Sequence, residues 1–481
     1  PSRREQGRIR LDSPIGADVD VRLAPSKDKA KTDAAISVFK RFASESISFC
    51  ALARFLNELG WRNGCGGFFQ AQQGEAMLED PIFIGYYAWN KRHFGKFNRY
   101  ADGQVIPELN YEEQHAVELL SGTLEKHGFE VERGVGGVET AFTATLPGRG
   151  GEGPTVAILA EYDALPDIGH GCGHNLIAMA AIGAGLGLQA NLENLPGRIM
   201  VIGTPAEEGG GGKIRMLDGG VFEGVDAVLS SHPSSNRTVI PTDIPVGESW
   251  SLAMVGYRYI FHGKAAHAAA MPHEGINALN GVIHLFSGID SLRQHLREDT
   301  RIHGVITDGG RAPNVVPEYA AANFMLRCRD RDYLNDVIVG RVLNAAEGAA
   351  AMTGCRLEVE EYYPFYENVR PNSVIAGLLL NNAEVAGLPL NEPFPGRQGS
   401  AASTDFGNVS QALPSYELRY AVSEQPVASH SREMTETAIS DYAINAAINV
   451  AKTSTLTACD LLLDPGLVSA AQADFEKRGG A

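Results

Sequence analysis

The sequence predicts an α/β protein whose doubly wound, mostly parallel sheet is interrupted by a smaller α+β domain. Apolar runs at 156–160, 199–202 and 227–229 each end in polar residues, which is typical of buried parallel strands. A small-residue segment of helical length, 175–189, lies between the first two runs. From about residue 247 the pattern changes to strand, helix, strand, helix and strand, which predicts an inserted domain.

Each part of the chain has its own local signals. A helix is expected at 111–127 because Gly128 can end it, and two strand-like runs follow at 129–132 and 140–146. The inserted domain is expected to contain these strands and helices in order: 250–262, 275–296, 319–327, 333–352 and 356–362. The expected division is an unassigned N-terminal extension at 1–105, a main domain at 106–246 and 366–481, and the inserted domain at 247–365.

The composition indicates a folded protein that does not bind polyanions through bulk charge. Hydrophobic residues make up 44% of the 481 residues and charged residues 21%, as in ordinary globular proteins. The net charge of −17 disfavours nucleic acid and anionic lipid as partners. No apolar run reaches the roughly 18 residues that cross a membrane, and no signal peptide is visible. Six scattered cysteines favour a reducing compartment, so we expect a cytoplasmic protein.

A glycine-rich turn at 167–175 carries the densest group of metal-binding residue types. It contains Cys172 and His174, and glycines let the backbone bend so that both can face one point. A thiolate and an imidazole together suit a borderline-soft divalent metal. Taken alone, the cluster is equally compatible with a buried thiol beside surface histidines.

Three further segments add to this group. Adjacent carboxylates at Glu207 and Glu208 can divide their work, one binding metal and the other taking a proton from metal-bound water. His232 follows another predicted strand, and His430 lies in a polar segment far downstream. Together with the turn, they supply roughly enough ligands for two metals sharing a site.

A cysteine nucleophile is the alternative interpretation of the same turn. Cys172 could be activated by His174 or His170 for hydrolysis through a covalent intermediate. That arrangement would leave Glu208, His232 and His430 without a role, and the chain has neither a Gly-x-Ser-x-Gly elbow nor a His-Glu-x-x-His helix.

An ordered series of motifs resembles the aminoacylase/carboxypeptidase family of di-metal peptidases, peptidase family M-twenty. The similarity is greatest to the amidohydrolase branch of p-aminobenzoyl-glutamate hydrolase, indole-3-acetyl-amino-acid hydrolases and aminoacylase-like dipeptidases. The motifs are Ala160-Glu-Tyr-Asp-Ala-Leu-Pro166, Gly169-His-Gly-Cys-Gly-His-Asn175, Pro205-Ala-Glu-Glu-Gly-Gly210, His262-Gly-Lys-Ala-Ala-His-Ala268, Pro313-Asn-Val-Val-Pro317 and Ser403-Thr-Asp-Phe-Gly-Asn-Val-Ser410. The match covers about residues 107–475, whereas residues 1–100 do not match.

The resemblance implies that the main domain is a di-metal catalytic domain and that the insert is a lid through which a homodimer forms. The residues that match metal ligands are Cys172, His174, Glu208, His232 and His430. Glu207 matches the catalytic carboxylate, and Asp163 matches an acid near the metals. On the lid, His267 matches the histidine that contacts the reacting carbonyl, while Asn314 and Arg327 fall where a polar end of the substrate is bound.

These assignments predict a metal-dependent amidohydrolase of small N-acyl amino acids or dipeptide-like amides. Glu207 would take a proton from metal-bound water, and the resulting hydroxide would attack the amide carbon. Two divalent ions are expected, Zn²⁺ or Mn²⁺ first and Co²⁺ or Ni²⁺ as further possibilities. One alternative keeps the site but removes an amine from an aromatic or amidine-like carbon. A second alternative, a catalytically silent binding protein, is disfavoured by the intact Glu207.

Overall fold

The computed structural model describes residues 10–11, 23–24, 97–101, 104–108, 112–392 and 402–479. The chain divides into two compact units, Pro1–Glu108 and Leu109–Ala481. In the first unit, β1 (Arg10–Leu11) pairs with β2 (Leu23–Ala24), and β3 (Phe97–Ala101) pairs with β4 (Gln104–Glu108), both antiparallel. Most of the expected N-terminal extension lies outside the described residues.

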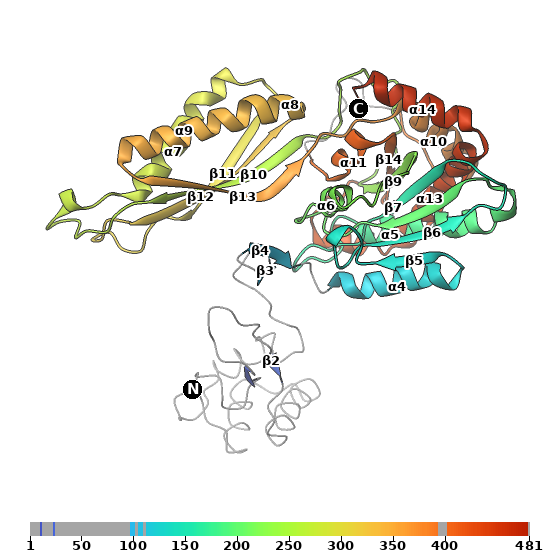
Figure 1. The fold of residues 1–481 in the computed structure, drawn as a ribbon, viewed down its shortest axis with the longest axis horizontal. Helices are drawn as coiled ribbons and strands as arrows, with labels where there is room; N and C mark the ends of the chain where they lie inside the picture. Colours follow the sequence, from blue (N-terminus) through green and yellow to red (C-terminus); the bar gives the residue numbers. More distant parts are fainter. Residues whose placement is uncertain are drawn as a thin grey trace, which may run out of the picture. The chain divides into compact units, whose positions relative to one another are not determined.

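A six-stranded sheet forms the centre of the second unit, in the order β14-β9-β7-β8-β6-β5 (Figure 1). The first four strands are parallel, and β6 and β5 add an antiparallel edge. The strands are β5 (Glu130–Arg133), β6 (Phe142–Pro147), β7 (Thr155–Ala160), β8 (Arg198–Gly203), β9 (Ala227–Ser234) and β14 (Ser415–Ala421). The predicted mostly parallel sheet is therefore confirmed.

Helices cover both faces of this sheet, which is why its central strands are apolar throughout. Alternate residues of β7 point to opposite faces: Ile158 packs in one hydrophobic core and Leu159 in another. One face carries α5 (His174–Gln189), α10 (Ser373–Ala386) and α13 (Asp441–Leu463), and the other carries α6 (Gly212–Asp218) and α11 (Phe406–Ala412). The remaining helices of this sheet's domain are α4 (Glu112–Lys126), α12 (Arg432–Thr437) and α14 (Pro465–Lys477).

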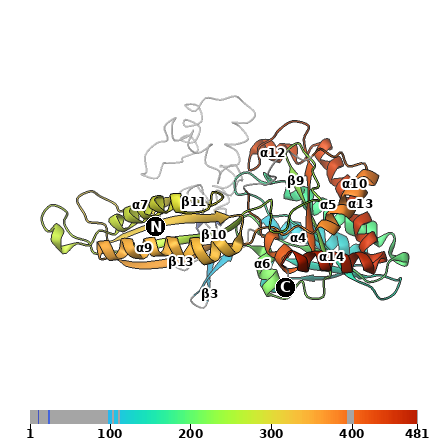
Figure 2. The same ribbon diagram turned by 90° about the horizontal axis from the view of Figure 1, so that it is seen from above.

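The inserted segment forms a separate antiparallel sheet in the order β11-β12-β10-β13. Its strands are β10 (Ala253–His262), β11 (Arg301–Asp308), β12 (Tyr319–Cys328) and β13 (Arg356–Tyr366). Two helices, α7 (Ala278–Leu292) and α9 (Gly340–Thr353), pack on one face through residues such as Leu285 and Val342, and Figure 2 shows them along this sheet. The α+β insert within an α/β fold is thus confirmed.

One strand of this insert was not expected from the sequence. β11 lies at the edge of the sheet, and seven of its eight residues are exposed, so it lacks the apolar alternation that marks a half-buried strand. The predicted helix at 333–352 also differs, because a π-helical segment, Leu334–Val339, precedes α9. Short helical turns complete the described chain at Val135–Gly137, Leu192–Asn194, Pro272–Glu274, Arg293–His295 and Arg331–Tyr333.

Within the described part of the chain, no helix combines the length and the apolar character that crossing a membrane requires.

Candidate active site

Parallel strand order gathers the candidate residues at one edge of the central sheet. The strands β7, β8 and β9 run in the same direction, so the segments that follow them meet outside their carboxyl ends. Asp163 follows β7, Glu207 and Glu208 follow β8, and His232 lies near the end of β9. The structure therefore brings these side chains, far apart in sequence, to one place.

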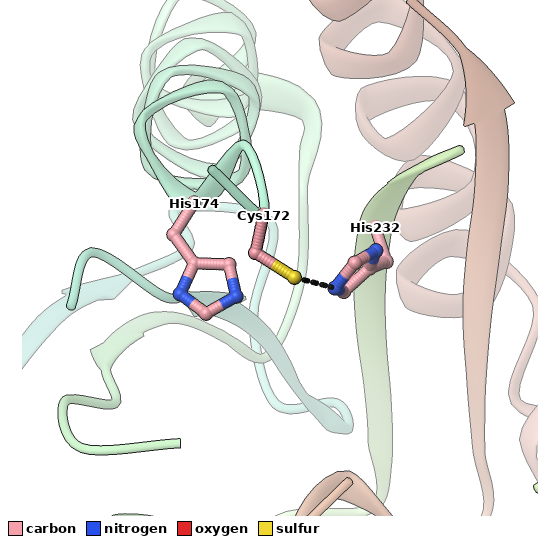
Figure 3. Close-up of side chains that lie close together, drawn as sticks. All are labelled: Cys172, His174 and His232. Carbon is pink, nitrogen blue, oxygen red and sulfur yellow. Dashed lines mark hydrogen bonds between the residues drawn. The ribbon is translucent and has the colours of Figure 1, made fainter. Parts of the chain in front are cut away.

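The five predicted ligands form two groups that share Cys172. One group contains Cys172, His174 and His232, and the other contains Cys172, Glu208 and His430. In each group one ligand atom per residue lies within 4.8 Å of the others. The Sγ atom of Cys172 is 3.9 Å from Nε2 of His232 and 3.5 Å from Nε2 of His430. Figure 3 shows the sulfur of Cys172 directed at the imidazole of His232, with His174 beside it.

Hydrogen bonds orient two of the histidines toward the shared thiol. Nδ1 of His174 donates to the backbone oxygen of Asp163 at 3.0 Å and to its Oδ1 at 3.1 Å. Nδ1 of His232 donates to the carbonyl of Pro233 at 2.7 Å. Because each Nδ1 carries the proton, each Nε2 keeps a free lone pair, which is how ligand histidines are commonly oriented in metalloproteins.

Unpaired buried atoms support a metal at this place. Among the described residues, Nε2 of His174 and Oε1 of Glu208 are buried and have no hydrogen-bond partner. Their nearest ionic contacts, to Glu161 and His430, are 3.5 Å long. Buried polar atoms are nearly always hydrogen-bonded, so an imidazole and a carboxylate atom beside a thiol that are not hydrogen-bonded indicate another partner. That combination of donors fits divalent transition metals such as zinc.

Burial also sets the charge state of the site. It raises the pKa of Cys172 to about 12, so the thiol needs a nearby cation to lose its proton readily. Burial, followed by the charge of Glu161, raises the pKa of Glu207. For Asp163 burial works in the same direction, but the adjacent imidazole of His174 and the hydrogen bond from its Nδ1 outweigh it and lower the pKa to about 2. Asp163 is therefore a permanent anion that holds His174.

Sequence reasoning missed a buried ion-pair network beside Glu207. Lys213 is fully buried, and its Nζ pairs with Oε2 of Glu161 and, at 2.7 Å, with Oδ1 of Asp405. Glu161 in turn forms a third group of possible ligands with His174 and Glu207. Glu161 and Asp405 lie within the family motifs, but a lysine after four glycines resembles a solvated loop residue, so Lys213 gave no signal.

The loop that carries Glu207 and Glu208 is bound to the strand returning from the inserted domain. The hydroxyl of Tyr366 donates to the carbonyl of Glu207 at 2.6 Å, and that of Tyr363 donates to the carbonyl of Glu208 at 2.5 Å. Oδ2 of Asp163 accepts the backbone N–H of Glu208 at 2.9 Å. These contacts fix the backbone of the loop from two sides.

The three candidate residues of the inserted domain do not lie together. His267 and Asn314 are exposed in adjacent loops, joined where Ala268 N–H donates to the carbonyl of Asn314 at 3.0 Å. Arg327 lies near the other end of β12, where it donates to Ser403 Oγ at 3.2 Å. Between Tyr319 and Arg327 the strand extends roughly 25 Å at about 3.3 Å per residue. One chain therefore brings Arg327, but not His267, to the catalytic domain.

Family models match two parts of the chain. Residues 157–451 match peptidase family M20/M25/M40, which is more than half of the chain. Residues 30–116 match a model described as Recombinase, and this segment lies almost wholly outside the described residues.

Curated relatives and solved structures agree with the first match. The chain is 35% identical to Xaa-Arg dipeptidase of Mus musculus, covering 77% of the chain and 86% of the relative. It is 32% identical to a p-aminobenzoyl-glutamate hydrolase protein of Escherichia coli, with 77% and 90% covered. A putative aminohydrolase from methicillin-resistant Staphylococcus aureus superposes with a TM-score of 0.61 at 20% identity, covering 74% of this chain and 93% of that chain, which shows a shared fold. The chain therefore belongs to peptidase family M20/M25/M40, a family of metal-dependent peptidases and amidohydrolases, and is a hydrolase that acts on carbon–nitrogen bonds.

Proposed function

We propose that the chain hydrolyses the amide bond of small N-acyl amino acids or dipeptides with two divalent metal ions. The observation that carries the proposal is the pair of ligand groups that share Cys172, placed beside the buried carboxyl of Glu207. Relatives named as a dipeptidase, a p-aminobenzoyl-glutamate hydrolase and an N-acetyl-L-cysteine deacetylase support the substrate class. The dipeptides, p-aminobenzoyl-glutamate and N-acetyl-L-cysteine in those names all contain an amide bond to an amino acid.

The proposed ligands divide between the two groups. His174 and His232 would hold one ion, Glu208 and His430 the other, and Cys172 would bind both. The bound ions would supply Lewis-acid activation of water and of the amide carbonyl. The thiolate favours Zn²⁺, while Mn²⁺, Co²⁺ and Ni²⁺ also accept this mixed set of ligands.

Glu207 is proposed to move the proton. Its carboxylate would accept a proton from the attacking water and deliver it to the leaving amine nitrogen. The raised pKa that burial gives Glu207 suits both halves of this exchange, because the group binds the proton firmly enough to carry it between the two steps. Asp163 would keep His174 in place, since its carboxylate accepts hydrogen bonds from Nδ1–H of His174 and from the backbone N–H of Glu208.

Arg327 is proposed to bind the carboxylate of the amino-acid portion of the substrate. Its Nε is buried without a hydrogen-bond partner among the described residues, although its Nη1 donates to Ser403. A guanidinium with an unused donor fits a planar carboxylate. Asn314 is proposed to contact the same substrate from the other loop.

We further propose a homodimer through the lid, residues 247–365, that brings His267 and Asn314 to the partner's catalytic site. Among the described strands, the edge strand β11 pairs only with β12, and Val305 and Ile306 on it are 61% and 42% exposed. An open apolar edge of this kind is available for pairing with a second copy. The length of β12 between Tyr319, which follows the loop of Asn314, and Arg327 supports a site completed by two chains. The domain limits of 106–246 with 366–481, and the cytoplasmic location, remain predictions.

An assay that joins metal analysis to product analysis tests the proposal. Purified protein should carry up to two transition-metal ions per chain and should release free amino acid from an N-acyl amino acid or dipeptide panel. Chelation should abolish that release, and metal should restore it. Full activity in demonstrably metal-free protein would refute the metal chemistry. Release of ammonia from aromatic amines or amidines, without amide cleavage, would instead favour the deaminase alternative.

A further inference from the structure

Ala206, the residue before Glu207, has a backbone conformation that residues with a side chain rarely adopt. Its φ is +61°, in the left-handed region, and the residue is buried. A non-glycine residue stays in this region only when surrounding contacts hold it there. Because Ala206 follows β8 directly after Thr204 and Pro205, its conformation sets the direction in which Glu207 leaves the sheet.

A buried carboxyl from a distant helix holds this residue. Oε1 of Glu113, on α4, accepts the N–H of Ala206 at 3.0 Å, and Oε2 accepts the hydroxyl of Thr140 at 2.7 Å. Glu113 is 2% exposed although it carries an ionisable group. The carbonyl of Ala206 accepts the N–H of Gly210 at 3.0 Å, which closes the loop on its other side. The backbone N–H and the backbone carbonyl of the strained residue are thus both hydrogen-bonded.

The hydrogen bonds of Glu113 do not require a negative charge. Burial, followed by the charge of Asp163, raises the pKa of Glu113 to about 7, so the carboxyl can carry a proton near neutral pH. A protonated Oε2 would donate to Thr140 instead of accepting from it, and Oε1 would still accept from Ala206. An uncharged group of the same shape should therefore hold the loop equally well.

We propose that Glu113 is a positioning residue for the catalytic loop at 204–212: it holds Ala206 in the left-handed conformation that directs Glu207 toward the ligand groups. The inference rests on the role of Glu207 in the proposed function. Glu113 acts through the backbone of Ala206, since its hydrogen bonds go to Ala206 and Thr140. The sequence gives no sign of this, because 93 residues separate the two partners.

Variants at Glu113 and Ala206 test the proposal. Glu113→Leu removes both hydrogen bonds and should lower kcat by about tenfold to a hundredfold, as expected when a reacting group is misplaced. KM and metal content per chain should stay near the values of the unaltered protein. Glu113→Gln keeps an oxygen for Ala206 and should retain kcat within about threefold. Adding Ala206→Gly to Glu113→Leu should restore part of kcat, because glycine adopts a positive φ without strain.

The matched control is Glu118→Leu, an exposed position on the same helix, which should leave kcat unchanged. A kcat for Glu113→Leu equal to that of Glu118→Leu would overturn the proposal, and so would an equal loss in Glu113→Gln or a loss that Ala206→Gly does not relieve. If Glu113→Leu does not fold, Glu113→Asp decides: it keeps the charge but is too short to reach Ala206, so its kcat should fall while that of Glu113→Gln does not.

Glu207→Gln, measured in parallel, separates this proposal from the proposed function. Near-normal turnover in Glu207→Gln would refute the role of Glu207 itself, whatever the Glu113 variants do. An inactive Glu207→Gln beside fully active Glu113 variants would refute only the positioning role.

Discussion

Replacing Lys213 with methionine should destabilise the catalytic domain by about 3–5 kcal/mol, because the change leaves two buried carboxylates without their cation. Lys213 has no exposed surface, and its ammonium contacts both Glu161 and Asp405. Methionine has a similar length and is apolar, so it fills the space without replacing the charge. The predicted loss is therefore electrostatic rather than a loss of packing.

The assay is thermal unfolding followed by circular dichroism after chelation, so that bound metal does not add to stability. For a domain of this size, 3–5 kcal/mol corresponds to a fall in Tm of roughly 6–20 °C. The control is Lys126→Met, an exposed lysine at the end of α4, which should change Tm little. Adding Asp405→Asn to Lys213→Met removes one unpaired charge and should restore part of the Tm.

The Tm deficit of Lys213→Met should also depend on pH, and its direction follows from the pKa of Asp405. Burial raises the pKa of Asp405 from its ordinary value of 3.8 to about 6, although Lys213 opposes the rise. A carboxyl whose pKa is raised on folding contributes stability below its unfolded pKa and loses that contribution as pH rises through the folded value. Without Lys213 the pKa rises further, so the Tm deficit should be smaller at pH 5 than at pH 7. A Tm within about 2 °C of the Lys126→Met control at pH 7 would refute this reasoning.

Two further outcomes follow from the site and one from the net charge. Glu207→Gln should keep its metal and lose about 10²–10⁴-fold in turnover, whereas Glu208→Ala should lose metal as measured by elemental analysis. Mixing inactive Glu207→Gln chains with inactive His267→Ala chains should restore activity, because a mixed dimer has one site with both groups intact; no recovery in dimers shown to be mixed would exclude a shared site. A labelled DNA duplex should not bind the full chain at physiological salt, given its net charge of −17; a salt-dependent shift would point to residues 30–116, which match the recombinase model.

The local sequence was sufficient for the parallel strands of the central sheet and for the short-range parts of the site. The apolar runs that end in Asp163, Glu207 and His232 predict parallel strands, and such strands place their carboxyl ends at one edge. Cys172 and His174 are two residues apart on a glycine-rich turn, so their proximity follows from the chain itself. The order of the motifs was specific enough to identify the family from the sequence.

Contacts between distant segments could not be predicted from the sequence, because no local pattern encodes which buried groups will face each other. The edge strand β11 gave no periodic signal, since water rather than a core covers most of its side chains.

Lys213 and its partner Asp405 are 192 residues apart in the sequence, and Glu113 and Ala206 are 93 apart. In both pairs the polar group is buried, and a buried polar group is costly without a partner. The sequence by itself determined the family of this protein and predicted the sheet edge where the candidate residues gather. Only the tertiary structure decided which buried charges and hydrogen bonds hold that chemistry in place, because their energies depend on desolvation and distance, which exist only once the chain has folded.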